Sequence, residues 1–178
     1  MKLFSLYLDE GIEILRRLWT ESNVTYEGQF YQFEDVTIEP KPVKGSLDIW
    51  IGGKSDAILK RVVRLGDGWF PALTTPQEFR TDMDKLQAYG ETYGRPVDSR
   101  EAGVLLLTHV CDDKEKGWET VAPFLRGLPM PPEDLAQRCV VGTPEECVEK
   151  IQDFVDAGCV KFVLRPACPL EEIQPQIK

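Results

Sequence analysis

The feature of this sequence that most constrains its fold is a regular alternation of short apolar runs with segments of helical periodicity. The apolar runs, which are typical of buried strands, occupy residues 47–51, 69–71, 104–110 and 160–164. The segments with apolar residues at helical spacing occupy residues 55–65, 75–93, 112–124 and 143–158. Alternation of this kind produces parallel strands joined by right-handed crossovers. We therefore predict an α/β chain of about four parallel strand–helix units.

The start of the chain follows a different pattern. Apolar residues at helical spacing predict a helix over residues 9–20. Aromatic and β-branched residues on both sides of Gly28 predict a hairpin over residues 24–33. Each later helix is expected to begin after a residue that favours the N-cap position, namely Ser55, Thr75, Asp112 or Asp113, and Thr143.

Composition and charge narrow the class of protein. The chain has 178 residues, of which 42% are hydrophobic, and this suits a domain with a buried core and argues against disorder. A formal net charge of −9 argues against nucleic acid and against an anionic membrane surface as partners. No apolar run approaches the roughly 20 residues of a membrane-spanning helix. We expect a single cytoplasmic domain over residues 1–178.

The cysteines and the histidine give little reason to expect metal or disulfide chemistry. The five cysteines are odd in number, form no Cys-x-x-Cys motif and lie in or beside apolar segments, so we expect buried free thiols. A single histidine with scattered cysteines cannot build a typical zinc site, and no metal is expected.

The turn Gly52-Gly53-Lys54-Ser55 is the leading candidate for a functional site. Consecutive glycines after a strand let backbone N–H groups approach an anion, and the N-terminus of the next helix adds partial positive charge. Ser55 can both cap that helix and hydrogen-bond a phosphate, and Lys54 can add a charge. The same residues also suit a tight strand-to-helix turn that needs positive φ, and the sequence favours neither explanation.

Two better-known phosphate-binding motifs are excluded. A P-loop requires glycine at the position of Asp48. The dinucleotide-binding fingerprint requires glycine at the position of Pro71, so Gly66 and Gly68 are better explained as a helix end and a turn.

His109 and Arg165 are weaker candidates for substrate contacts. His109 lies near the end of the strongest predicted strand, which is the functional end in a barrel, although a lone histidine in an apolar run is more often structural. Arg165 directly follows the last predicted strand. It can bind an anionic group there or pair with an acidic neighbour.

An ordered series of short motifs resembles the luciferase-like monooxygenase family. The motifs are EILRRLWTE (13–21), VTYEGQFY (24–31), EPKP (39–42), IWIGG (49–53), RLGDGW (64–69), VGTPE (141–145) and FVDAG (154–158). Taken together, these motifs are most similar to those of the F420-dependent oxidoreductase branch of the family. The resemblance implies a TIM (β/α)8 barrel that binds coenzyme F420 or FMN and carries out hydride transfer or oxygen insertion on a small molecule. It places the cofactor at Gly52 and Gly53, with nearby contacts from Lys54, Ser55 and Asp56.

The resemblance covers the second half of such a barrel. A complete barrel needs about 250 residues and eight strands, whereas this chain begins to match at the helix before the fifth strand. The amino-terminal half is expected to be absent from this chain, and no residue here matches the family's catalytic positions. We therefore expect a partial barrel that forms a homo-oligomer or needs a partner with the other half. The alternatives are a non-catalytic half-barrel or binding module, and another α/β phosphate-binding enzyme.

Overall fold

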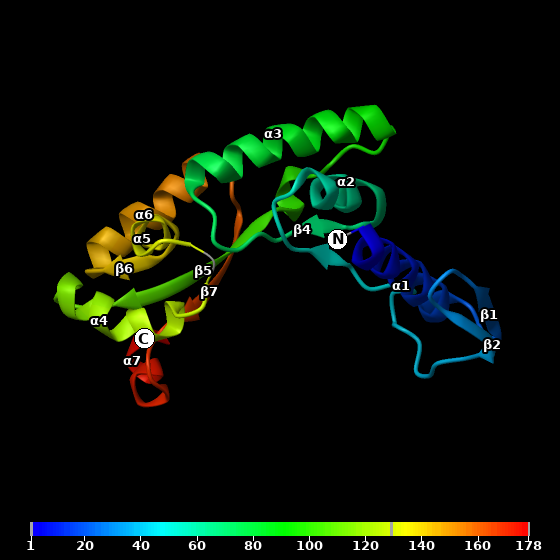
Figure 1. The fold of residues 1–178 in the computed structure, drawn as a ribbon, viewed down its shortest axis with the longest axis horizontal. Helices are drawn as coiled ribbons and strands as arrows, with labels where there is room; N and C mark the ends of the chain where they lie inside the picture. Colours follow the sequence, from blue (N-terminus) through cyan, green and yellow to red (C-terminus); the bar gives the residue numbers. More distant parts are fainter. Residues whose placement is uncertain (1, 129, 178) are drawn as a thin grey trace.

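The computed structural model describes residues 2–128 and 130–177, which form an open arch of strands and helices (Figure 1). The N-terminal helix and hairpin form one end of the arch, and the C-terminal segment lies at the other. Within these residues no helix is long and apolar enough to cross a membrane.

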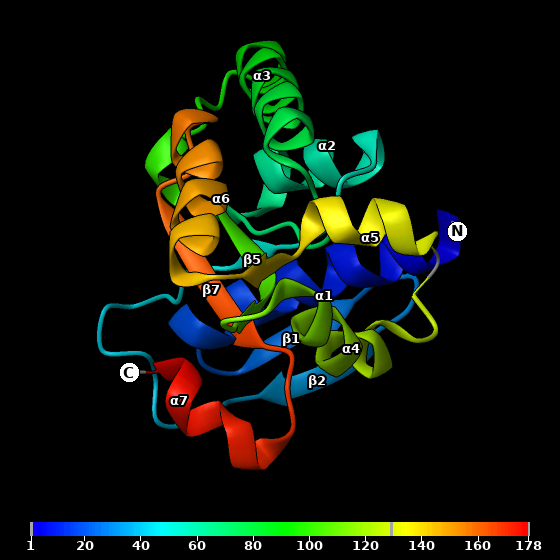
Figure 2. The same ribbon diagram turned by 90° about the vertical axis from the view of Figure 1, so that its left-hand side faces the viewer.

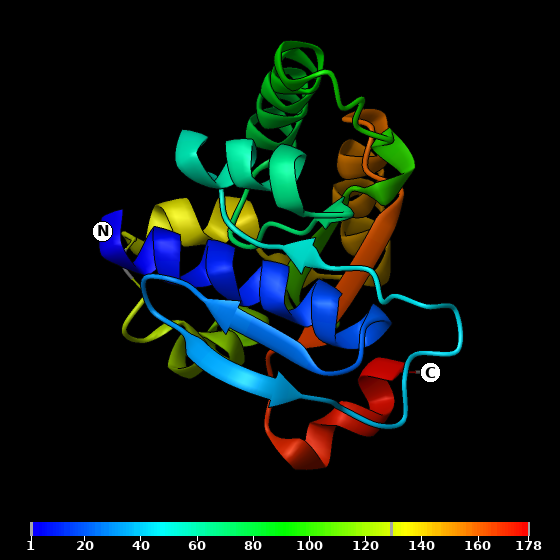
Figure 3. The same cartoon turned by 90° about the vertical axis from the view of Figure 1, so that its right-hand side faces the viewer.

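The N-terminal end of the arch is a helix that carries a hairpin. Its elements are α1 (Lys2–Thr20), β1 (Val24–Glu27) and β2 (Gln32–Val36). The two strands pair antiparallel, which confirms the predicted hairpin, and α1 begins earlier than predicted. The carboxylate of Glu10 accepts hydrogen bonds from the amides of Gln29 and Phe30, so that the hairpin turn is fixed on α1 (Figure 3).

Parallel strands form the centre of the arch. They are β3 (Trp50–Ile51), β4 (Gly68–Trp69), β5 (Gly103–Val110), β6 (Val140–Gly142) and β7 (Lys161–Pro166). Strand β3 pairs with β4, and β5 lies between β6 and β7. Parallel bridges from Trp69 to Ala102 and from Ala72 to Leu105 join β4 to the first half of β5. The predicted strands therefore follow one another across the sheet in chain order.

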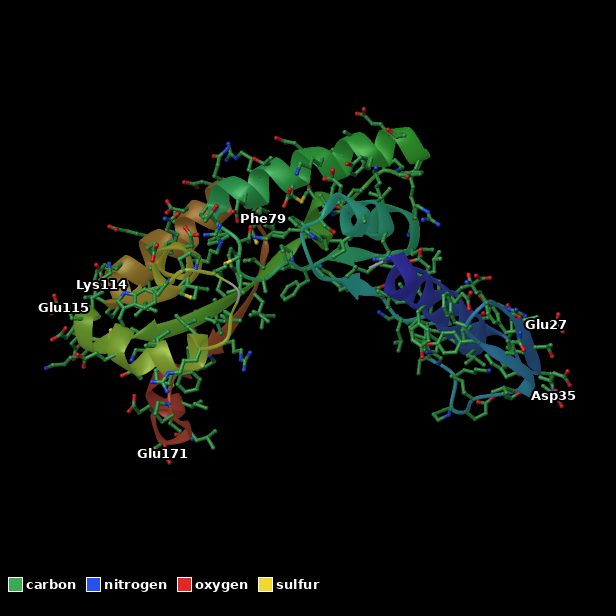
Figure 4. The ribbon with its side chains drawn as sticks, viewed as in Figure 1. Glu27, Asp35, Phe79, Lys114, Glu115 and Glu171 are labelled. Atoms are coloured by element: carbon green, nitrogen blue, oxygen red, sulfur yellow. The ribbon has the colours of Figure 1, made fainter. Side chains whose placement is uncertain are left out.

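Three helices cover the convex side of these strands. They are α2 (Asp56–Leu65), α3 (Pro76–Tyr93) and α6 (Pro144–Asp156). The main hydrophobic core lies beneath them, where the fully buried ring of Phe79 stacks on Trp69 at 5.1 Å between centroids and meets Phe154 edge-on at 6.5 Å. Figure 4 places Phe79 between α3 and the strands.

The starts of these helices follow the predicted caps with one exception. The Thr75 and Thr143 side chains each accept a hydrogen bond from the amide of the glutamate three residues on, and Glu78 and Glu146 complete both capping boxes. Ser55 has the extended backbone of an N-cap residue, but its side chain makes no capping hydrogen bond. The cap predicted for its side chain is therefore wrong.

The remaining helical segments lie on the other side of the strands or at their ends. They are η1 (Ser99–Glu101), α4 (Lys114–Leu125), α5 (Pro132–Arg138), η2 (Leu170–Glu172) and α7 (Ile173–Ile177). Helix α4 packs Val121 against Val141 and Ala167, opposite the face that α6 covers (Figure 2). The carboxyl-terminal part of β5 is thus covered on both sides, in keeping with its unbroken apolar run.

The structure differs from the prediction mainly by strand β6 and helix α5. Strand β6 pairs with residues 108–110 of β5, on the edge opposite β7. It has three residues, which is shorter than the runs that indicate a strand in a sequence. The strands do not close on themselves within the described residues, since β3 and β7 each pair on one side only. The fold is therefore α/β with the architecture of a partial barrel.

Candidate functional site

The Gly52–Gly53 turn lies at the carboxyl end of β3, as predicted. Gly53 has φ of +107°, a conformation that side chains disfavour, and a Cβ atom there would lie 2.5 Å from the Cδ1 atom of Ile58. The Trp69 indole N–H donates to the Gly53 carbonyl at 2.8 Å. The backbone of the turn is thus held by a buried aromatic residue of the neighbouring strand. Gly52 is exposed, so its backbone is open to approach.

The residues after the turn start α2 and leave polar groups unpaired. The Ser55 hydroxyl makes no capping hydrogen bond, and the first amides of a helix lack intrahelical acceptors. These groups and the positive end of α2 suit a phosphate. The Asp56 carboxylate is also exposed at this end, and the Lys85 ammonium 3.8 Å away offsets part of its negative charge.

Lys54 is turned away from this helix start. Its ammonium donates to the Leu73 carbonyl at 2.8 Å and to the Glu78 carboxylate at 3.1 Å. Glu78 also accepts from Arg138, whose side chain is 11% exposed. The charge of Lys54 is therefore already matched by Glu78, and the turn fits a phosphate through its backbone and through Ser55 rather than through Lys54.

The charge of Glu78 is favoured by its surroundings. Partial burial raises the pKa of Glu78, but hydrogen bonds from the Thr75 amide and from Lys54, together with the Arg138 charge, outweigh this effect. The net result is a pKa below the usual value of 4.5, so Glu78 is ionised at neutral pH. The network therefore joins the turn, α3 and α5 through charged groups.

Arg165 lies at the carboxyl end of β7, beside Leu107 in the register of β5 and β7. It lines a cavity of about 170 Å³ on the concave side of the strands. Leu73 lines the same cavity, and its carbonyl binds Lys54, so the cavity and the Gly52–Gly53 turn are neighbours at the carboxyl ends of the strands.

His109 is placed differently from Arg165. Its side chain is buried beneath α4, close to Gly117, and its Nδ1 atom has no hydrogen-bond partner in the part of the chain that is described. It does not line the Arg165 cavity. In residues 2–128 and 130–177, no three His, Cys, Asp or Glu side chains are close enough to hold a metal ion.

Some residues of the site were not predicted. Glu78 was recognised as part of a helix start, but its contacts with Lys54 and Arg138 join residues 24 and 60 positions apart, which no local pattern reveals. The indole hydrogen bond from Trp69 to Gly53 likewise depends on the pairing of β3 with β4.

Comparison with known proteins identifies the family. The model of the luciferase-like monooxygenase family matches residues 6–133, which is well over half of the chain. The chain belongs to this family. The match confirms the resemblance seen in the sequence motifs.

Curated relatives in the luciferase-like family use two kinds of cofactor. An F420-dependent glucose-6-phosphate dehydrogenase from Intrasporangium calvum is 26% identical over 174 residues, covering 85% of this chain and 52% of the relative. An FMNH2-dependent dimethylsulfone monooxygenase from Pseudomonas putida is 30% identical over 118 residues, covering 66% of this chain and 32% of the relative. The luciferase-like chain described here thus spans about half the length, or less, of the curated relatives that it matches.

Solved structures of luciferase-like proteins share the fold. An F420-dependent secondary alcohol dehydrogenase in complex with an F420–acetone adduct matches with a TM-score of 0.77 at 18% identity, covering 90% of this chain and 55% of that chain. The F420-dependent tetrahydromethanopterin reductase from Methanopyrus kandleri matches with a TM-score of 0.74 at 17% identity, covering 92% and 57%. The arch therefore corresponds to about half of these larger folds.

Proposed function

We propose that this chain is the carboxyl-terminal half of a luciferase-like oxidoreductase that uses F420 or FMN on a small-molecule substrate. The observation that carries the proposal is the Gly52–Gly53 turn at the start of α2, where the Ser55 hydroxyl makes no capping hydrogen bond. These groups stand at the carboxyl end of a parallel strand, where barrels of this class carry their sites. The F420-dependent and FMNH2-dependent relatives support both cofactors, and the motifs favour F420.

The chain's own residues bind and orient the phosphate end of the cofactor. Bound F420 or reduced FMN supplies hydride transfer or oxygen insertion at its ring. Gly52, Gly53 and Ser55 would hold the phosphate, while the Trp69 indole holds the backbone of the turn. Asp56 stands beside the phosphate site, and Lys85 offsets part of the repulsion between its carboxylate and a phosphate. Lys54 fixes the turn to Leu73 and Glu78 and so keeps the site rigid.

We propose that a second half-barrel completes the site, either from another copy of this chain or from a partner of similar fold. Unpaired strand edges favour association, and β3 and β7 present such edges within the described residues. Val163 and Leu164 of β7 are 46% and 47% exposed, which leaves apolar surface for a partner to cover. The same observation favours the second candidate function, a half-barrel that binds a partner without catalysis.

A cytoplasmic location is also part of the proposal. The five cysteines are free thiols in the structure, and four of them are buried, which suits a reducing compartment.

The test is a titration of the purified chain with F420 and with FMN, followed by cofactor fluorescence, while light scattering reports the mass in solution. We expect saturable binding of at least one cofactor. Ser55→Asp should weaken it about tenfold or more, because aspartate is a good N-cap residue but repels a phosphate. Ser22→Asp adds the same charge at an exposed position in another turn and is the matched control.

Cofactor binding and mass together separate the two candidate functions. Saturable cofactor binding that depends on Ser55 supports the enzyme. A stable dimer or complex that binds neither F420 nor FMN would show that the chain is a non-catalytic half-barrel. Equal weakening by Ser22→Asp and Ser55→Asp would show that bulk charge, and not the turn, governs binding.

A further inference from the structure

The concave side of the strands carries a small cavity with one charged wall. Its volume is about 170 Å³, well below the 300–1,000 Å³ of sites for drug-sized ligands, so it admits only a small molecule or one end of a larger one. It lies beside the middle of β5 and the carboxyl ends of β4 and β7, and Lys54 connects it to the Gly52–Gly53 turn.

Most of the cavity wall is apolar. Leu105 and Leu107 of β5 form its floor, since their neighbours Val104 and Leu106 belong to the core on the convex side. Phe124, at the end of α4, forms another part of the wall. Phe124 is 44% exposed, so part of its side chain is open to a ligand. The wall therefore suits a hydrocarbon or aromatic group.

Arg165 is the one charged residue among the described residues that line the cavity. Its side chain has no hydrogen bond or ion pair with any residue in the described part of the chain, in contrast to Arg138, which pairs with Glu78. A guanidinium group offers two parallel donors that match the geometry of a carboxylate. Arg165 is exposed, so both donors are open to a ligand. One unpaired cation in an apolar wall suits a ligand with a single negative charge.

We propose that this cavity binds the carboxylate end of a small apolar acid, and that such an acid is the substrate class of the enzyme. The carboxylate pairs with Arg165, and the hydrocarbon part lies on Leu105, Leu107 and Phe124. The assignment to substrate rests on the proposed function, whereas the binding of an apolar acid at Arg165 does not. An inorganic phosphate is a poorer match, because its second charge has no partner in the cavity.

The experiment uses the chain without cofactor and benzoate as the probe. Binding is measured by calorimetry, and methyl NMR spectra report whether the leucines of the cavity are affected. We expect benzoate to shift the methyl signals of Leu105 and Leu107. We also expect it to bind at least about tenfold more tightly than benzamide, which has the same shape but no charge. Arg165→Gln should weaken benzoate binding about tenfold and leave benzamide binding unchanged, whereas Arg165→Lys should retain part of it.

Arg126→Gln is the matched control. Arg126 is also exposed and lies beside an apolar groove, between α4 and α5, but that groove contains the acidic Glu133. We expect Arg126→Gln to bind benzoate like the unmodified chain. The proposal is overturned if Arg165→Gln binds benzoate as tightly as the unmodified chain, if both variants weaken it equally, or if benzamide or inorganic phosphate binds as well as benzoate.

Failure of this proposal is distinguishable from failure of the proposed function. A chain that binds F420 or FMN at Ser55 but shows no benzoate binding refutes the apolar-acid site alone. A chain that binds benzoate at Arg165 but neither cofactor refutes the oxidoreductase and retains a site for apolar acids.

Discussion

Glu78 offers the sharpest test of how the candidate site is held together. Its carboxylate accepts hydrogen bonds from Lys54 at 3.1 Å, from the Thr75 amide at 3.1 Å and from Arg138. Glu78→Gln keeps the shape and the acceptor for the Thr75 amide but removes the charge. Lys54 and Arg138 would then lose their carboxylate partner, and the Arg138 side chain is 11% exposed.

The expected loss of stability follows from these contacts. A hydrogen bond to a charged group contributes about 1.5–3 kcal/mol when it is well buried. The Glu78 side chain is 38% exposed, so solvent screening reduces that figure, and we expect Glu78→Gln to cost about 2 kcal/mol. For a chain of this size each kcal/mol lowers the melting temperature by about 2–4 °C, so the expected drop is about 4–8 °C.

Glu146→Gln is the matched control because Glu146 occupies the same position in the capping box of α6. Its cationic partner is Lys114, at 2.7 Å, and the Lys114 side chain is 53% exposed. We expect a much smaller loss of stability from Glu146→Gln in urea and thermal unfolding. Equal losses for the two variants would show that the capping boxes alone stabilise the helices and that the Lys54–Glu78–Arg138 network does not.

The pH dependence gives an independent check of the same reasoning. The pKa of Glu78 is lowered in the folded chain, so its charge stabilises the fold above the ordinary pKa of 4.5. This contribution is lost as the pH falls through the lowered pKa, where Glu78 takes up a proton. The difference in stability between the unmodified chain and Glu78→Gln should therefore be full at pH 7 and shrink in acid. A difference that stays constant down to acidic pH would contradict the ionised network.

Two further predictions concern the turn and the thiols. Gly53→Ala should destabilise the chain by about 1–3 kcal/mol in urea unfolding, because of its φ of +107° and the contact with Ile58. Gly127 has φ of +85°, and a Cβ atom added there would have no atom within 4 Å. Gly127→Ala should therefore lower the free energy of unfolding by less than Gly53→Ala does. An equal loss would argue against the Ile58 contact. Burial raises the pKa of Cys139 and of Cys159 to about 11, so both thiols should resist iodoacetamide at pH 8 until the chain unfolds. Rapid labelling of either thiol in the folded chain, detected by mass spectrometry, would contradict this expectation.

The elements that the sequence predicted well are those with local causes. The capping boxes of α3 and α6 depend on residues three positions apart, so Thr75 and Thr143 marked both helix starts correctly. The apolar run of β5 was equally clear because its convex face lies in the main core and α4 covers the end of its other face. The predicted hairpin after the first helix was confirmed for the same reason, since β1 and β2 are joined by a short turn.

The elements that the sequence could not predict depend on tertiary contacts. Strand β6 has three residues and is a strand because residues 108–110 of β5 lie beside it. The direction of the Lys54 side chain depends on Glu78, which α3 brings close after a further strand. The family resemblance implied a cofactor contact for Lys54, and only the folded chain reveals that the Glu78 carboxylate pairs with it.

The concave face of the sheet is filled near the amino ends of the strands and open further along them. At the amino ends of the strands the face is filled, because Trp50 meets Phe70 edge-on and the Lys161 ammonium lies 4.5 Å from the centre of the Trp50 ring. Lys161 is in turn paired with Glu101 at 2.5 Å, so its charge is already matched. Two layers further along β5 and β7 stand Leu107 and Arg165, and here the face opens into the cavity. The layer of Trp50, Phe70 and Lys161 is closed by its own contacts. The layer of Leu107 and Arg165 leaves a cation and apolar surface open to a ligand.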